Sequence, residues 1–123
     1  MAMTAAELVE IAMMHFDNAI SLVAIQLSVL SGYAIIIHLV GSSLSSSKFT
    51  VLNIGYLLWF SLLWLSTIGM MKNGLMSIAL ANEITGRDTI VTPNSMVYYS
   101  VVVAFGVGAS IWYGFTLRHE ENQ

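Results

Sequence analysis

The sequence of 123 residues contains no cysteine, a single proline and very few charged side chains. Without cysteine, the chain has no disulfide framework, no thiolate nucleophile or metal site, and no lipidated cysteine. Charged residues make up 9% of the chain, whereas a soluble domain usually carries about 25%. Four Lys and Arg and seven Asp and Glu are too few to coat a soluble surface of this size. The composition therefore excludes an ordinary water-soluble globule, a disordered tail and a basic nucleic-acid-binding protein.

The residues that are present are 57% hydrophobic, and the charges among them are clustered. Thirty residues between Asp17 and Lys48 carry no charge, nor do twenty-three between Lys48 and Lys72 or twenty-nine between Asp88 and Arg118. A bilayer core of about 30 Å requires roughly 20 apolar residues in a helix. A backbone in lipid must also satisfy its own hydrogen bonds, which favours helices. The sequence therefore predicts a single all-α domain that is integral to the membrane.

We place the three predicted spans at residues 18–40, 50–71 and 96–117. Barrel strands are excluded because apolar and polar residues do not alternate, and because three spans cannot close a barrel. The first seventeen residues contain three acidic residues and no Lys or Arg, and the first span is longer than the apolar part of a signal peptide. We therefore expect this segment to be retained.

Shorter elements are predicted on both sides of the spans. Thr4 and Glu7 have the spacing of a capping box, which predicts that a short amphipathic helix begins there and continues into the first span. The serine-rich residues 41–47 form a short turn, so the first two spans are antiparallel. Asn73-Gly74 predicts a kink or break after the second span. The segment 75–84 then reads as a short interfacial helix or as an extension of that span.

The orientation in the membrane is left open by the basic residues. Lys48 and Arg118 lie on one side of the predicted bundle, and Lys72 and Arg87 lie on the other. The positive-inside rule depends on an excess of Lys and Arg on one side, and here the two sides are equal.

The first span carries a stripe of polar and small residues with alternating steps of four and three, as in a heptad seam. The stripe consists of Glu10, Met14, Asp17, Ser21, Ala24, Ser28, Ser31, Ile35 and His38. Ala24, Ser28 and Gly32 also form a ladder of small residues, a pattern that lets helices approach closely in lipid. The favoured interpretation is that this face packs against the second or third span. The alternative is that several copies line a pore, with Glu10 and Asp17 at its mouth.

Two further groups of residues are predicted to join helices. Gln26 lies on a second polar face of the first span, where an amide requires a partner, and the hairpin places Ser66 or Thr67 at its depth. Asn53 is expected to be buried as well. Two polar faces on one helix suggest that the first span also contacts another subunit. The third span has its own ladder of small residues, Gly106, Ser110 and Gly114.

Chemically reactive patterns are sparse. His38, Tyr56, Trp112 and Tyr113 should lie near one membrane face. The favoured interpretation is an interfacial histidine bonded to a neighbouring side chain, and the alternative is a site for a head group, quinone or small amphipathic ligand. The sequence has no HExxH motif, no nucleophile–base pair and no nucleotide-binding loop, and His15 and Asp17 point to different sides of a helix. We therefore expect no metal, no haem or other cofactor, and no catalytic activity.

The composition and the helix faces lead to two hypotheses about function. The first is a non-catalytic membrane subunit that assembles with itself or with other membrane subunits. The second is an oligomeric channel or facilitator for a small cation or solute, lined by the polar face of the first span.

Overall fold

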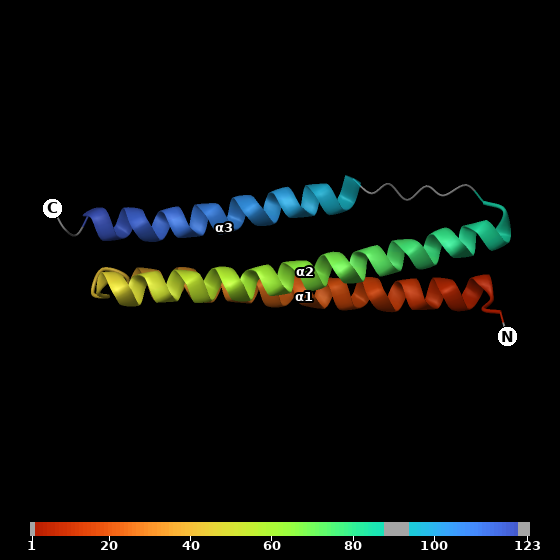
Figure 1. Ribbon diagram of the computed structural model, residues 1–123, viewed down its shortest axis with the longest axis horizontal. Coiled ribbons are helices and arrows are strands. Elements are labelled where there is room, and N and C mark those ends of the chain that lie inside the picture. The colour runs from red at the N-terminus through yellow and green to blue at the C-terminus, as the bar shows by residue number, and fades with distance from the viewer. Residues whose placement is uncertain (1, 88–93, 121–123) are drawn as a thin grey trace.

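Three helices make up nearly all of the described chain. The computed structural model describes residues 2–87 and 94–120. Its helices are α1 (Ala5–Val40), α2 (Ser46–Thr85) and α3 (Asn94–Glu120), shown in Figure 1. All three are long and apolar enough to cross a membrane. For the described residues, the predicted all-α architecture with three potential spans is confirmed.

The helices run alternately up and down. α1 and α2 lie side by side and antiparallel along their whole length, whereas α3 lies beside only the part of α2 nearest the α1–α2 turn (Figure 1). At about 1.5 Å per residue, α1, α2 and α3 are roughly 54, 60 and 40 Å long. α1 and α2 therefore extend together beyond the level at which α3 begins.

The helix ends follow local sequence signals. Thr4 caps α1, and its side chain and that of Glu7 make the two reciprocal bonds of a capping box, as predicted. Ser45 caps α2, where its hydroxyl accepts from the backbone N–H of Lys48. At the other end of α2, Gly86 adopts a left-handed conformation with φ of 65°, which glycine accommodates without strain.

α2 continues through Asn73-Gly74, so the predicted break is wrong. Gly74 is buried, and a Cβ atom placed on it would lie 2.7 Å from Cε1 of Phe16. The absent side chain thus gives the Phe16 ring of α1 room against the α2 backbone. Residues 75–84 continue α2. Of the two interpretations of this segment, the extension of the second span is therefore correct, and the separate interfacial helix is not formed. The amphipathic segment after Thr4 is likewise the first part of α1.

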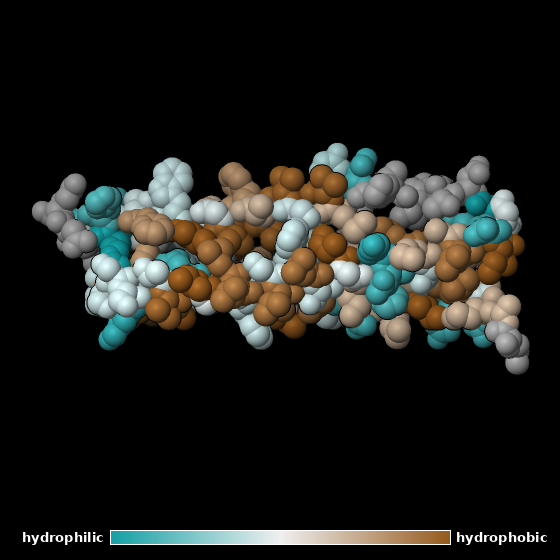
Figure 2. All heavy atoms as spheres, viewed as in Figure 1, coloured by the Kyte–Doolittle hydropathy of each residue, from teal (hydrophilic) through white to brown (hydrophobic). Residues whose placement is uncertain are grey.

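The core is small and lies where all three helices meet. Its buried residues are Tyr33, Ile37, Phe49, Tyr56 and Phe60. Much of the apolar surface is left outside: Phe105 is 80% exposed and Val102 is 71% exposed. In Figure 2, hydrophobic residues predominate between a hydrophilic group at the end with the α1–α2 turn and another near the beginning of α3. A surface of this kind is suited to lipid rather than to water.

Candidate functional site

A hydrogen-bonded amide connects all three helices near the middle of the bundle. Gln26 of α1 is 3% exposed. Its Nε2 donates to Oγ1 of Thr67 in α2 at 3.1 Å, and its Oε1 accepts from the hydroxyl of Tyr99 in α3. Thr67 in turn donates to the carbonyl of Leu63. Both ends of the buried amide are therefore satisfied without water.

Two stacked tyrosines form a second polar junction, closer to the α1–α2 turn. The rings of Tyr33 and Tyr56 have centroids 4.0 Å apart and are inclined by 16°. The hydroxyl of Tyr33 donates to Oδ1 of Asn53, and that of Tyr56 lies 3.1 Å from Oγ of Ser110. Asn53 is 8% exposed, and its Nδ2 donates to the Phe49 carbonyl. These contacts join α1 to α2 and α2 to α3 by aromatic stacking and hydrogen bonds.

The residues predicted as a ligand or lipid site do not converge on one cavity. His38 and Tyr113 are both exposed, and Nδ1 of His38 lies 3.2 Å from the Tyr113 hydroxyl. Tyr56 is instead buried in the core, and Trp112 is 73% exposed. The structure therefore shows a surface contact between α1 and α3 at this position, with one of the four side chains turned inward.

The small-residue ladder of α3, Gly106, Ser110 and Gly114, faces the inside of the bundle. Gly114 is buried, and a Cβ atom on it would lie 3.2 Å from Cγ2 of Ile37 and 3.4 Å from the Tyr33 hydroxyl. A Cβ atom on Gly106 would lie 3.6 Å from Leu30, and Ser110 bonds to Tyr56 as described above. The ladder Gly106, Ser110 and Gly114 thus lets α3 approach α1 and α2 of the same chain.

The α1 stripe, defined above as nine residues from Glu10 to His38, faces outward. All nine side chains are exposed. The hydroxyls of Ser21 and Ser28 donate to carbonyls of their own helix, those of Asp17 and Ala24. A Cβ atom on Gly32 would have no atom within 4 Å. Apart from the contact of His38 with Tyr113 of α3, this face does not pack against α2 or α3, so the interpretation that it packs against the second or third span is wrong for most of its length.

The acidic part of α1 shows no arrangement suited to metal binding. Among the described residues, no three His, Asp or Glu side chains are grouped closely enough to hold a metal ion. Glu10 and Asp17 are exposed, and Nδ1 of His15 is buried without a hydrogen-bond partner. The backbone N–H and hydroxyl of Thr4 donate to Glu7 and lower the pKa of its carboxyl. The Glu7 carboxylate therefore has a capping role.

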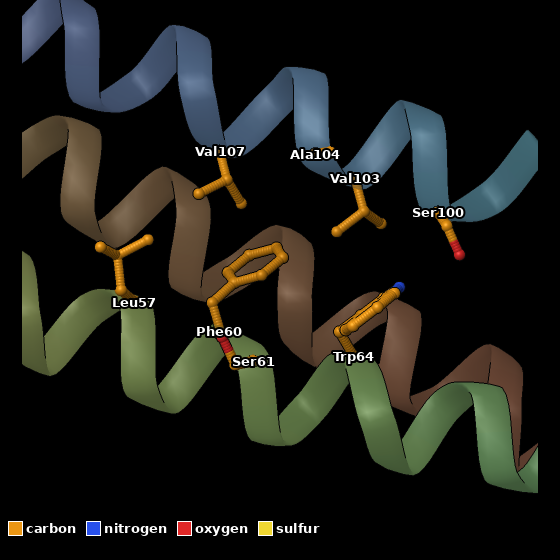
Figure 3. Close-up of a pocket in the computed structure, with 8 residues that line it drawn as sticks. All are labelled: Leu57, Phe60, Ser61, Trp64, Ser100, Val103, Ala104 and Val107. Carbon is orange, nitrogen blue, oxygen red and sulfur yellow. The ribbon is translucent and has the colours of Figure 1, made fainter.

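A cavity of about 190 Å³ lies between α2 and α3 (Figure 3). Its lining is mainly apolar, and Phe60 and Trp64 of α2 face Val103 and Val107 of α3 across it. Nε1 of Trp64 is buried and has no hydrogen-bond partner. The interface between α2 and α3 is much less extensive than the interface between α1 and α2. The cavity thus reflects loose packing of α3 rather than a set of converging reactive groups.

Two residues that make contacts between helices, Tyr99 and Arg118, are not among the predicted site residues. The hydroxyl of Tyr99 in α3 donates to Gln26 of α1. Arg118 contacts Ser46 and Phe49 across the bundle. The antiparallel topology could have indicated the second contact, because it brings the end of the third span beside the beginning of the second.

Comparison with known proteins gives no relative from which a function could be inferred. No protein-family model, no curated protein and no solved structure matches this chain.

Proposed function

We propose that this chain is a non-catalytic integral membrane subunit that assembles through the α1 stripe, either with further copies of itself or with other membrane subunits. Three apolar helices of sufficient length support insertion in the membrane.

The observation that carries the proposal is the exposure of the whole α1 stripe. Lipid tails offer no hydrogen bonds, so a face with Ser21, Ser28 and Ser31 gains little from contact with lipid. Small residues let a second helix approach closely, and van der Waals packing is the main force between helices in a bilayer. The α3 ladder of Gly106, Ser110 and Gly114 is already used inside the chain, whereas most of the α1 stripe is available to a second helix.

A channel or facilitator is the second function supported by this face. Six of the nine stripe residues are polar or charged, and the two carboxylates, Glu10 and Asp17, lie toward one end. If several copies turned these faces toward a common axis, the carboxylates would form rings at one mouth, a common device for attracting cations.

Native mass spectrometry after extraction in mild detergent tests the assembly. The expected result is a fixed oligomer or a defined complex. Ser28→Phe should weaken the assembly, because overpacking of about 1–3 kcal/mol corresponds to roughly 5- to 150-fold in affinity. Ile36→Phe is the matched control, since Ile36 is 44% exposed on α1 but lies outside the stripe. Recovery of the unmodified chain only as a monomer would contradict the proposal.

Flux into liposomes separates the two functions. A channel should admit cations at a rate above that of empty liposomes, and Asp17→Asn should reduce its preference for cations. An assembled subunit without a pore should show no flux above that of the empty vesicles. If the protein is oligomeric but shows no flux above that of empty liposomes, the channel is excluded and the non-catalytic subunit remains as the proposed function.

A further inference from the structure

A basic cavity lies at the end of the bundle that holds the α1–α2 turn. Its volume is about 350 Å³, and it is lined by Ser46, Phe49, Thr50, Phe115, Arg118 and His119. The beginning of α2 and the end of α3 meet there (Figure 1). Because the charge-free stretches of both helices end at this level, a bilayer around them would place its phosphate layer beside the cavity.

We propose that this cavity binds the phosphate of an anionic phospholipid, with Arg118 as the principal ligand. The proposal rests on the membrane location inferred above, but not on the assembly through α1. Basic pockets between transmembrane helices are typical sites for anionic head groups. A phosphodiester also presents two oxygens that match the planar donor fork of a guanidinium group.

Arg118 is held in place by its neighbours within the chain. Its Nη2 donates to Oγ of Ser46 at 2.9 Å, and its guanidinium carbon lies 4.8 Å from the centroid of the Phe49 ring. Phe49 is 3% exposed, and Phe115 packs edge-on against it with the ring centroids 5.2 Å apart. Because these contacts already restrict the long side chain, less conformational entropy is lost when it binds a ligand. The two rings also form an apolar wall beside which an acyl chain could lie.

The charges near the cavity favour an anion. Lys48 follows closely on Ser46, and the first turn of α2 directs the positive end of its dipole toward this face. Glu7, Glu10, Asp17 and Glu83 belong to the overhanging parts of α1 and α2 at the opposite end.

Native mass spectrometry of the delipidated protein tests this site. The protein is titrated with phosphatidylglycerol and, separately, with phosphatidylcholine, and bound lipids are counted on each chain. The unmodified protein should prefer phosphatidylglycerol. Arg118→Gln should reduce that preference about fivefold, the effect of one basic residue near an anionic head group. Lys72→Gln removes one charge at the other face and should leave the preference unchanged.

A conservative variant distinguishes a loss of lipid binding from misfolding of the protein. Arg118→Lys keeps the charge but loses the bidentate geometry, so its preference should fall between those of the unmodified protein and Arg118→Gln. An equal preference in the unmodified protein and both Arg118 variants would overturn the proposal, as would an equal loss with Lys72→Gln. Displacement of phosphatidylglycerol by millimolar inorganic phosphate would show a site for free phosphate and would also overturn it. Because lipids are counted on each chain, a purely monomeric protein would contradict the assembly without affecting this test.

Discussion

The buried amide of Gln26 provides the sharpest test of how the bundle is held together. Its side chain is 3% exposed and bonds to Thr67 of α2 and to Tyr99 of α3. Gln26→Met keeps nearly the same length and volume but removes both hydrogen bonds. Since the shape is conserved, the change should report the polar contacts and not a new cavity.

The expected loss of stability follows from the two bonds. Hydrogen bonds between transmembrane side chains average about 0.6 kcal/mol and reach about 1.7 kcal/mol. Two such bonds give about 1.2 kcal/mol, with an upper limit of about 3.4 kcal/mol. Tyr99 would also lose its acceptor, whereas Thr67 would still donate to Leu63. We therefore expect Gln26→Met to lower the free energy of unfolding by about 1–3 kcal/mol.

Reversible unfolding in mixed micelles, as the fraction of denaturing detergent rises, measures this difference. A double-mutant cycle with Thr67→Val should give a coupling free energy of about 0.6 kcal/mol. Ser28→Ala is the control, because the Ser28 hydroxyl bonds only to its own helix and its loss should cost less than about 0.5 kcal/mol. If Gln26→Met left the stability unchanged, or if the cycle gave no coupling, the junction would not stabilise the bundle.

Two further substitutions test other contacts of the bundle. Gly114→Leu should destabilise the packing of α3 by about 1–3 kcal/mol, because a Cβ atom there already lies 3.2 Å from Ile37. Gly108→Ala should not destabilise it, because a Cβ atom on Gly108 meets nothing within 4 Å, and unfolding in mixed micelles would show the contrast. The hydrogen bonds from Thr4 lower the pKa of the Glu7 carboxyl below the ordinary value for glutamate. Its stabilisation of the first turn of α1 is therefore present above that ordinary pKa and is lost as the pH falls through the lowered pKa. An NMR titration should show this, and Thr4→Ala should move the midpoint upward; an unmoved midpoint would contradict the capping role.

Much of the fold could be predicted because the charged residues separate three long charge-free stretches of the sequence. The three charge-free stretches determine the helices, and the short turn at residues 41–47 determines the antiparallel hairpin. That hairpin in turn predicts Ser66 or Thr67 at the depth of Gln26, and the structure shows a hydrogen bond to Thr67. These inferences need only the rise of a helix and the direction of the chain.

Three features of the structure depend on packing between helices and could not be predicted from local sequence patterns. Glycine favours a break in an isolated helix, but Gly74 gives room to Phe16, and that contact keeps α2 continuous. Periodicity identifies a face of α1 without showing which neighbour covers it, and the stripe is exposed. The antiparallel topology brings Arg118 to the level of Phe49, but the position of the guanidinium over the ring depends on the angle at which α3 approaches α2, for which the sequence carries no local signal.

Photo-crosslinking from α1 in native membranes tests the central claim most directly. A small diazirine-bearing amino acid would replace Ala24, Ser28 or Ser31 in separate variants, with Ile25 and Ile36 as exposed positions beside the stripe. If α1 assembles through the stripe, the three stripe positions should yield a product of defined mass, containing either a second copy or one partner, and the two lateral positions should yield little. Equal yields at all five positions, or products with lipid alone at the stripe, would contradict the account.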